Sequence, residues 1–353
     1  MPMRSVFSTA HGTESAKHAT IVEVIDDGVS GWGECPALEH PTYTEEYADG
    51  AFAVLATQLA PAALEGPHWR DAVTGNPMAK AGLELALLDH RLRSDGKSLV
   101  AHLEEVTASR ALSAVPAGIS LGITRDLDEL VSRVTRAVAE GYQRVRLKID
   151  RDWDYQPLAA IRSRFPTLPL QVDANGSYRL DDLGALQRLE EFGLLMIEQP
   201  LPADDLRGHC LLSRRLAIPL CLDEPITGAE AASAAIAMGA CSIVNIKVAR
   251  LGGLGETLAT LGVCRSTGAG AWCGGMLDTG IGRAVNLAVA ALDGFTTPGD
   301  IAATDRYFDR DLITTRFHVE SGAITVPHGS GIGVEIDRDA LEAFTTHRVV
   351  LRR

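Results

Sequence analysis

Ionisable side chains recur at a nearly constant interval through the middle of this 353-residue sequence. Each one ends a short apolar run, and the members are Lys148, Asp173, Glu198, Asp223 and Lys247. The first four are 25 residues apart, and the fifth follows 24 residues later. A strand, a helix and two short loops take up about 25 residues of chain, so the interval predicts consecutive strand–helix units of a (β/α) barrel. The charged groups then meet at the carboxyl ends of the strands, where barrel enzymes hold their reactive groups.

The segments before this repeat predict a small α+β domain. Residues 20–25 and 29–34 alternate like the two strands of a hairpin around an Asp-Asp-Gly turn. Residues 44–63 and 78–94 have the apolar periodicity of helices. We therefore expect residues 1–112 to form a first domain with its own strands and helices.

The barrel is expected to occupy residues 113–300. A strand within 113–123 opens it, residues 270–276 form the seventh strand, and a short closing strand lies near 294–297. The remaining segment, 301–353, again contains hairpin-like alternation, and we expect it to return to the first domain.

The acidic balance of the chain restricts its partners. It has 46 acidic and 33 basic residues, a net charge of −13, whereas nucleic-acid binding requires clustered Lys and Arg. No apolar run approaches the roughly 18 residues of a membrane span, and the first residues contain no signal-like apolar stretch. The six cysteines are scattered without a Cys-x-x-Cys pair, which is typical of a reducing compartment. We predict a cytoplasmic protein with no nucleic-acid and no membrane partner.

The three acidic members of the repeat favour a hard metal ion. Asp173, Glu198 and Asp223 follow three successive strands, so the spacing between neighbouring strands brings their carboxylates together. Oxygen ligands without His or Cys favour Mg²⁺, or Mn²⁺, over zinc. A single acid at a strand end is commonly a capping or ion-paired group. Three acids at equal intervals on the reactive face of a barrel indicate a metal site instead.

The two lysines are expected to face each other across the mouth of the barrel. Lys148 ends the second strand and Lys247 the sixth of eight, with the acids between them, and both lie in apolar runs where solvation is difficult. A neighbouring metal ion favours the neutral amine that a general base needs near pH 7. Arg146 shares a strand face with Lys148, and Arg250 lies just past Lys247. Each arginine either acts on its neighbouring lysine or pairs with a carboxylate.

This set of groups suits one type of reaction. A proton next to a carboxylate is very weakly acidic, so a lysine alone cannot remove it. Mg²⁺ bound to that carboxylate stabilises the enediolate that forms. We therefore predict abstraction of a proton α to the carboxylate of a small-molecule carboxylate substrate. Cys273 has no adjacent base, and the glycine-rich segments 252–256 and 329–334 lack the context of a dinucleotide site.

The ordered motifs of the whole chain resemble the enolase superfamily, in its muconate-lactonizing-enzyme subgroup, and most of all the o-succinylbenzoate synthase / N-succinylamino acid racemase family. The motifs are WGEC (32–35), NPMAKAGLELALLD (76–89), RLKI, QVDAN, LLMIEQPL, LCLDE, IVNIK, WCGGM and PGD (298–300). The resemblance implies an α/β fold, a modified (β/α)7β TIM-type barrel with an α+β capping domain. Enolase-type sites are known to combine a Lys or His base with Mg²⁺.

Carried over residue by residue, the resemblance implies roles for the repeated groups. Lys148 and Lys247 become the acid/base pair, and Asp173, Glu198 and Asp223 become the ligands of Mg²⁺ (or Mn²⁺). Further residues beside the ligands or the substrate complete the candidate site: Arg146, Asn175, Glu224, Arg250, Gly274 and Gly275. The resemblance also implies a mobile loop of the capping domain over the mouth, here near residues 10–17.

The chain departs from the family pattern in three places. Arg146 stands where the family has the first lysine of Lys-x-Lys; the charge survives, and we expect activity to persist with an altered rate, since a guanidinium is not equivalent to an ammonium. Asp278 stands where the family usually has Glu. No Asp-x-Asp occurs near 297–300, where similar dipeptide epimerases place one to hold an amino group.

The resemblance leaves two activities open. In dehydration to o-succinylbenzoate in menaquinone synthesis, Lys148 removes the α-proton and then protonates the leaving hydroxide, while Lys247 acts as a cation. In racemisation of N-succinylamino or other N-acylamino acids, both lysines exchange one proton from opposite faces. We favour dehydration from its frequency in the family, and some relatives do both. A non-catalytic carboxylate-binding barrel is a third alternative, but it would lack a ligand or a lysine. The sequence leaves homo-oligomer formation open.

Overall fold

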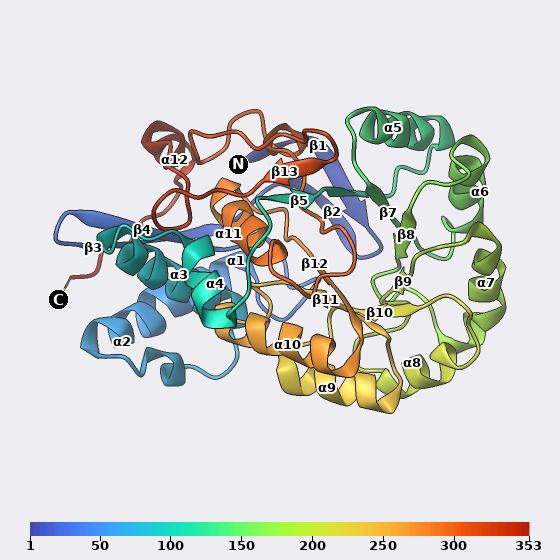
Figure 1. Ribbon diagram of the computed structural model, residues 1–353, viewed down its shortest axis with the longest axis horizontal. Helices are drawn as coiled ribbons and strands as arrows, with labels where there is room; N and C mark the ends of the chain where they lie inside the picture. Colours follow the sequence, from blue (N-terminus) through green and yellow to red (C-terminus); the bar gives the residue numbers. More distant parts are fainter. Residues whose placement is uncertain (353) are drawn as a thin grey trace.

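The computed structural model describes residues 1–352, and a curled, parallel, seven-stranded sheet forms its centre (Figure 1). The strand order follows the chain from β6 to β12. The strands are β6 (Gly118–Leu121), β7 (Arg144–Lys148), β8 (Leu170–Asp173), β9 (Ile197–Glu198), β10 (Leu220–Leu222), β11 (Ile243–Ile246) and β12 (Gly270–Cys273). Every strand expected from the repeat is present in sequence order, and the predicted barrel fold is confirmed.

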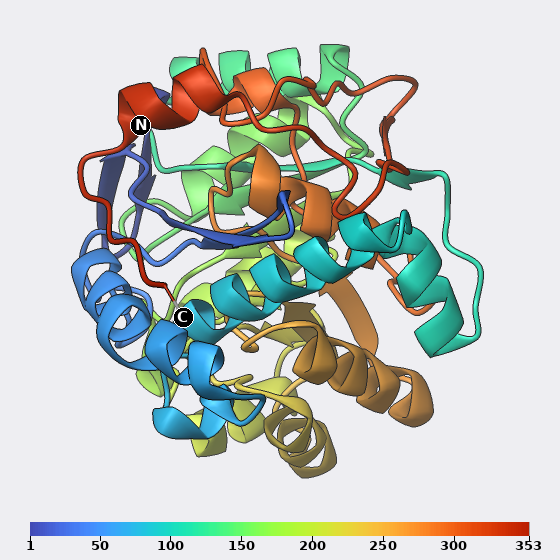
Figure 2. The same cartoon turned by 90° about the vertical axis from the view of Figure 1, so that its left-hand side faces the viewer.

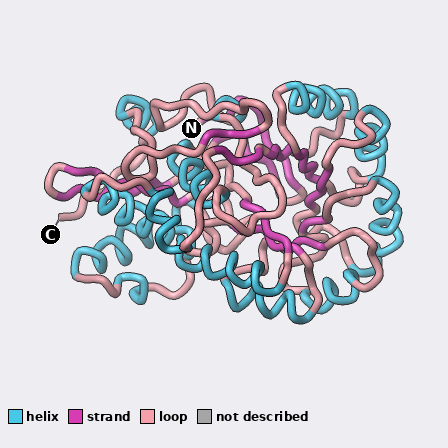
Figure 3. Tube along the Cα trace, in the orientation of Figure 1, coloured by secondary structure: helices cyan, strands magenta, loops and turns pink. Residues whose placement is uncertain are grey.

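Helices connect consecutive strands and form an arc outside the sheet (Figure 3). They are α5 (Leu127–Ala139), α6 (Tyr155–Arg164), α7 (Leu183–Arg188) between the 3₁₀ turns η3 (Leu180–Asp182) and η4 (Leu189–Phe192), α8 (Leu206–Ser213), α9 (Ala229–Met238) and α10 (Leu254–Thr267). Asp126 caps α5, because its carboxylate accepts hydrogen bonds from the amides of Asp128 and Glu129. Helices on one face and packed side chains on the other leave the strands buried, which explains their continuous apolar runs.

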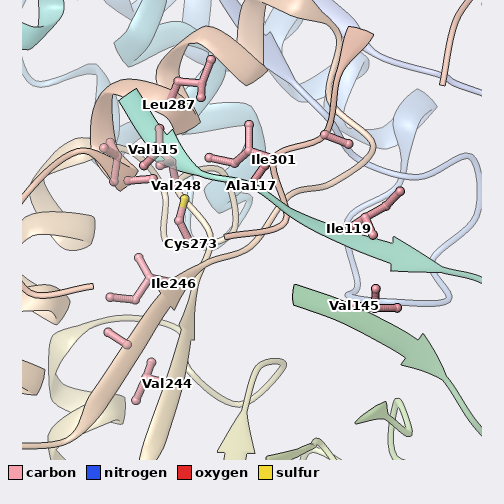
Figure 4. Packing of buried hydrophobic residues seen from close by; sticks show 14 of the residues in the cluster. Val115, Ala117, Ile119, Val145, Val244, Ile246, Val248, Cys273, Leu287 and Ile301 are labelled. Atoms are coloured by element: carbon pink, nitrogen blue, oxygen red, sulfur yellow. The ribbon is translucent and has the colours of Figure 1, made fainter. Parts of the chain in front are cut away.

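The barrel closes without an eighth regular strand. The predicted closing strand near 294–297 is wrong in position: residues 296–300 cross the gap instead. Thr296 N donates to Ala271 O of β12 at 2.8 Å, and Gly118 N of β6 donates to Gly299 O at 2.9 Å. Pro298 has no amide hydrogen, so this segment cannot form a continuous ladder. Figure 4 shows apolar side chains around this junction, including Ala117 and Cys273.

A buried arginine holds the closing segment. The Arg144 guanidinium donates to Pro298 O at 2.6 and 3.1 Å and to Asp300 Oδ1 at 2.7 Å. Gly118 leaves room for it, because a Cβ at Gly118 would collide with the Arg144 side chain. The side-chain hydrogen bonds of Arg144 therefore replace some of the backbone hydrogen bonds that an eighth strand would make.

The N-terminal part of the chain forms two hairpins and a layer of helices beside the barrel (Figure 2). The elements are β1 (Pro2–Thr9), β2 (Gly12–Ala16), β3 (Thr20–Asp26), β4 (Val29–Cys35), α1 (Ala48–Val54), a π-helical turn η1 (Leu55–Leu59), α2 (Ala60–Glu65), a 3₁₀ turn η2 (Trp69–Ala72), α3 (Pro77–Ser94) and α4 (Leu99–Thr107). The predicted hairpin and the two predicted helical regions are confirmed. Gly31 and Gly33 allow β4 to lie directly on α3, because a Cβ at either would collide with the helix backbone.

The segment near residues 10–17, expected to be a loop, is β2 with the turn that precedes it. β1 and β2 pair as an antiparallel hairpin, and Ile123 N of the barrel donates to Ser8 O of β1 at 2.9 Å. The strand was not recognised in the sequence because GTESA in β2 is almost entirely polar, so it carries no alternation that indicates a strand. The mobility of this segment stays a prediction.

The C-terminal segment contacts both parts of the molecule. After α11 (Gly280–Ala290), the last helix of the barrel region, the segment contains η5 (Thr304–Arg306), β13 (Ala323–Thr325) and α12 (Arg338–Phe344). β13 pairs antiparallel with β5 (Ala114–Pro116) at the start of the barrel, not with the N-terminal strands. Further on, Leu99 N of α4 donates to Gly331 O at 2.7 Å, so the tail also returns to the N-terminal helices. Within residues 1–352, no helix has the length and apolar character needed to cross a bilayer.

Candidate active site

The five repeated groups lie at the carboxyl end of the sheet. Lys148, Asp173 and Glu198 are the last residues of β7, β8 and β9, and Asp223 and Lys247 directly follow β10 and β11. Their exposed fractions run from 0% for Asp173 and Glu198 to 7% for Lys148. Buried charges must be paired or hydrogen-bonded, and each of these five groups has such a partner.

Arg146 lies between two of the carboxylates. Its Nη1 donates to Asp173 Oδ2 at 2.7 Å and to Glu198 Oε2 at 2.6 Å. The same guanidinium is ion-paired with Asp300 and lies over the Trp272 ring, 5.0 Å from the ring centroid. Of the two roles left open for Arg146, the structure therefore shows the pairing with carboxylates.

Lys148 shares its carboxylate with Arg146. Its Nζ donates to Asp173 Oδ2 at 2.6 Å and to Asn175 Oδ1 at 2.7 Å. Asn175 Nδ2 in turn donates to Glu224 Oε1 at 3.1 Å. Asn175 and Glu224 thus link the ends of β8 and β10 and orient the Lys148 amine.

Lys247 makes the corresponding contacts on the other side of the sheet. Its Nζ donates to Asp223 Oδ2 at 2.8 Å and to the Tyr43 hydroxyl at 3.0 Å, and Arg250 Nε lies 3.2 Å from Asp223 Oδ1. The Tyr43 hydroxyl donates to Asp223 Oδ1 at 2.9 Å. Tyr43 was not recognised in the sequence, because it belongs to a loop of the N-terminal domain and 180 residues separate it from Asp223. No local pattern records that contact.

Burial shifts the acid–base properties of this cluster. It raises the pKa of Glu198 to about 7, with Asp173 and Asp223 adding to the rise and Arg146 opposing it. It raises the pKa of Glu224 to about 8, with a contribution from Asp223. Burial would also raise the pKa of Asp223, but the positive charges of Lys247 and Arg250 outweigh burial and hold the pKa of that carboxyl below its usual value. Glu198 and Glu224 are therefore acids whose ionisation a further cation would favour.

The three carboxylates predicted as metal ligands are ion-paired in this structure. Among the side chains of residues 1–352, no group of three His, Cys, Asp or Glu has an arrangement that holds a metal ion. The physical reason is the ion pairing, because Arg146, Lys148 and Lys247 draw the carboxylate oxygens toward themselves.

The chemistry of the donors nevertheless fits a hard cation. Three buried oxygens near the cluster have no hydrogen-bond donor: Glu224 Oε2, Gln171 Oε1 and Asn245 Oδ1. The amide groups of Gln171 and Asn245 donate to Glu198 at 3.1 and 2.7 Å, so both side chains lie beside this carboxylate. An oxygen-only set with unpaired acceptors suits Mg²⁺ or Mn²⁺ better than a soft metal.

A cavity of about 900 Å³, a volume that includes its open mouth, lies above these groups. Lys148 and Lys247 both line it, from strands four places apart in the sheet. Arg146, Asn175 and Gly275 line it as well. The remaining candidates lie behind its wall: Asp173, Glu198, Asp223, Glu224, Arg250 and Gly274, the last against Asn245. The β1–β2 hairpin and the loop that contains Tyr43 contribute the opposite wall.

A parallel barrel that presents reactive groups at its strand ends and is covered by an N-terminal α+β unit defines a class of barrel enzymes. The comparisons identify the family within that class. The enolase C-terminal domain-like model matches residues 129–340, and the mandelate racemase / muconate lactonizing enzyme N-terminal domain model matches residues 1–103. The chain belongs to the enolase superfamily of enzymes.

Two relatives are similar over nearly the whole chain. An o-succinylbenzoate synthase of Geobacillus stearothermophilus is 42% identical over 366 residues, covering 100% of this chain and 95% of the relative. An N-succinylamino acid racemase of Amycolatopsis sp is 43% identical over 358 residues, covering 99% and 96%. A solved enolase-superfamily structure from Listeria innocua has a TM-score of 0.91 at 34% identity, covering 98% and 95%. The nearly equal identities to a synthase and a racemase do not separate those two activities.

Proposed function

We propose that this protein is a Mg²⁺-dependent enzyme that removes a proton α to the carboxylate of a small substrate. Dehydration to o-succinylbenzoate is the first candidate reaction, and racemisation of N-succinylamino acids is the second. The observation that supports the proposal is the placement of Lys148 and Lys247, which line one cavity from strands four places apart, beside three buried carboxylates.

Asp173, Glu198 and Asp223 would hold the metal ion, with the unpaired oxygens of Glu224 and Asn245 nearby. When bound there, Mg²⁺ supplies positive charge that stabilises the enediolate form of the substrate. Arg146 and Lys247, which are 4% and 5% exposed, add fixed positive charge in buried positions where such charge is more effective than in water.

Lys148 is the proposed base. A divalent ion held by Asp173 would take the place of Lys148 as the partner of that carboxylate, and the Lys148 amine would then be free to accept the α-proton. The amine takes the α-proton and becomes an ammonium. In dehydration, that ammonium returns the proton to the leaving hydroxide, and water and the alkene result.

Racemisation requires a second proton carrier on the opposite face. Lys247 is the proposed second carrier, and its lining of the cavity from a strand four places from that of Lys148 supports this. Its hydrogen bond to the Tyr43 hydroxyl and its ion pair with Asp223 stabilise the ammonium form, and Asp223 raises the pKa of Lys247 against the effect of burial. As an ammonium, Lys247 donates a proton in one direction of racemisation and acts as a cation in dehydration.

The test is an assay of the purified protein with both substrates, with and without Mg²⁺. We expect turnover of at least one substrate, its loss in chelator, and its return when Mg²⁺ is added. Turnover of neither substrate, or full activity in chelator, would contradict the proposal. The ratio of the two kcat/KM values then decides between dehydration and racemisation.

A further inference from the structure

Lys17 is a buried lysine that takes no part in the reaction described above. Its side chain is 4% exposed, and its ammonium donates to two backbone carbonyl oxygens, Pro36 O at 2.8 Å and Met276 O at 2.9 Å. Burial lowers the pKa of Lys17, while the charges of Glu34 and Asp278 oppose that effect. An ammonium is expensive to bury, so its retention at this place calls for an explanation.

The two hydrogen bonds join three separate segments of the chain. Lys17 directly follows β2 and so ends the β1–β2 hairpin, Pro36 begins the loop between β4 and α1, and Met276 belongs to the loop that follows β12. The first two segments come from the N-terminal domain and the third from the barrel. Lys17 is therefore a point at which these three segments are held together.

Each of these segments forms part of the cavity wall. The hairpin contributes Thr9 and Glu14, the loop after β4 contributes Leu38 and Tyr43, and the loop after β12 contributes a run that includes Leu277. Because Lys17 lies at the junction of all three, its hydrogen bonds determine how far apart the walls are.

The loop after β12 needs such support. Leu277 has φ = 55°, a left-handed conformation that is unfavourable for a residue with a branched side chain. On one side, Met276 N donates to Asp278 Oδ2 at 2.8 Å, and on the other the Thr279 hydroxyl donates to Glu34 Oε2 at 2.6 Å. Strained conformations persist only where surrounding contacts impose them, and the bond from Lys17 to Met276 O is one of those contacts.

We propose that Lys17 is a positioning residue that sets the shape of the substrate cavity. By donating to both Pro36 and Met276, it holds the hairpin and the two loops at the separation that a bound carboxylate substrate requires. The part of this inference that concerns substrate rests on the proposed function. Lys17 is not among the residues that line the cavity, and it donates to Pro36 and Met276 and not to the reacting lysines, so it acts on substrate affinity and not on the chemical step.

The test compares Lys17→Met with Lys17→Arg, which keeps the donors, and with Lys97→Met. Lys97 is a matched control, since it lies in the same domain but pairs with Glu105 outside the cavity wall. Two readouts are measured: amide hydrogen exchange over residues 2–16 and 274–279 without substrate, and kcat and KM. We expect faster exchange in both segments for Lys17→Met, with KM raised about tenfold and kcat changed less than about twofold. Lys17→Arg should keep both the exchange rates and the KM close to those of the wild type. Lys97→Met should match the wild type in both readouts.

Unchanged exchange in both segments of Lys17→Met would overturn the proposal, as would equal losses of kcat and kcat/KM with KM unchanged. Should the Met variant fail to fold, Lys17→Gln takes its place, because its amide keeps hydrogen-bond donors on a shorter, uncharged side chain; an intermediate result is then expected. The exchange measurement needs no substrate, so it decides the role of Lys17 even when the wild type turns over neither proposed substrate. A failure of the proposed function is thereby distinguished from a failure of the proposed role of Lys17.

Discussion

Lys148 and Lys247 have similar surroundings but different proposed tasks. Each donates to an aspartate and to one further oxygen, Asn175 Oδ1 for Lys148 and the Tyr43 hydroxyl for Lys247. The cation of Lys247 lies 4.3 Å from the Tyr43 ring centroid, an arrangement that favours the charged form. Dehydration uses that charge alone, whereas racemisation also uses a proton of Lys247.

The substitution Lys247→Arg separates these two tasks. Arginine stays protonated, so it keeps the positive charge but cannot exchange a proton near pH 7. Compared with Lys247→Ala, it should retain at least about tenfold more dehydration, given that removing one stabilising group costs about 10²–10³ in kcat. Racemisation should be lost in both variants. The measurement is kcat for both reactions, and equal dehydration by the Arg and Ala variants would contradict the cation role.

Arg146 affects the metal site in a predictable direction. Its Nη1 lies between Asp173 and Glu198, at 2.7 and 2.6 Å, and Trp272 and Asp300 hold it from behind. Arg146→Met removes a positive charge that competes for these two oxygens, so Mn²⁺ should bind at least about tenfold more tightly, or about 1.4 kcal/mol. Arg146→Lys should be intermediate, since an ammonium lacks the planar fork.

Titration of Mn²⁺ into each variant by calorimetry or electron paramagnetic resonance checks this without an activity assay. Weaker binding by Arg146→Met would mean that the guanidinium orders the ligands more than it competes with the ion.

At the scale of elements, the loop after β9 is tied to α8 by a buried histidine. Leu201 N donates to His209 Nε2 at 3.3 Å, so Nδ1 carries the hydrogen and donates to Asp205 O at 2.8 Å. This loop directly follows Glu198 and positions it. Both ring nitrogens are satisfied only in the neutral imidazole, and burial lowers the pKa of His209.

The sign of the resulting pH dependence follows from linkage. Below a pH of about 6.5 the unfolded chain protonates this histidine while the folded protein resists it, so the free energy of unfolding falls as pH falls, by at most about 1.4 kcal/mol per pH unit for one proton. His209→Gln should remove this part of the pH dependence. Denaturant unfolding at pH 7.5 and 5.5 measures it, and an unchanged difference between the two pH values would contradict the assignment.

The sequence predicts some elements much better than others for physical reasons. The barrel strands are predicted because burial on both faces produces apolar runs, and the βα unit sets their interval. The hairpin β1–β2 is missed because β2 is polar, and the closing segment is misplaced because hydrogen bonds to β6 and β12, and not an apolar run, define it. Arg144, which holds that segment, resembles any charged residue at the start of a strand.

At the scale of the whole molecule, the candidate site depends on both parts of the chain. The barrel strands supply Lys148, Lys247 and the carboxylates, and these were predictable because their positions repeat along the sequence. The N-terminal domain supplies Tyr43 and Lys17, whose contacts span 180 and 259 residues of sequence. Contacts of that kind depend on how the domains dock, which no local pattern records.

The convergence of the predicted metal ligands is a second point that the sequence could not decide. Strand spacing places Asp173, Glu198 and Asp223 side by side, but the orientation of each carboxylate depends on its competing partners. Here those partners are Arg146, Lys148, Lys247 and Arg250. The sequence therefore predicts which groups are neighbours, while side-chain electrostatics decides which of them are paired.

The central claim is that two opposed lysines and a divalent cation remove an α-proton in one cavity. The most direct test follows the α-proton of each N-succinylamino acid enantiomer by proton NMR in D₂O with Mg²⁺. We predict that the wild type replaces this proton with deuterium, that Lys148→Ala loses exchange with one enantiomer, and that Lys247→Ala loses exchange with the other. Exchange that survives equally in both variants with both enantiomers would contradict the account, as would a wild type that neither exchanges this proton nor carries out the dehydration to o-succinylbenzoate.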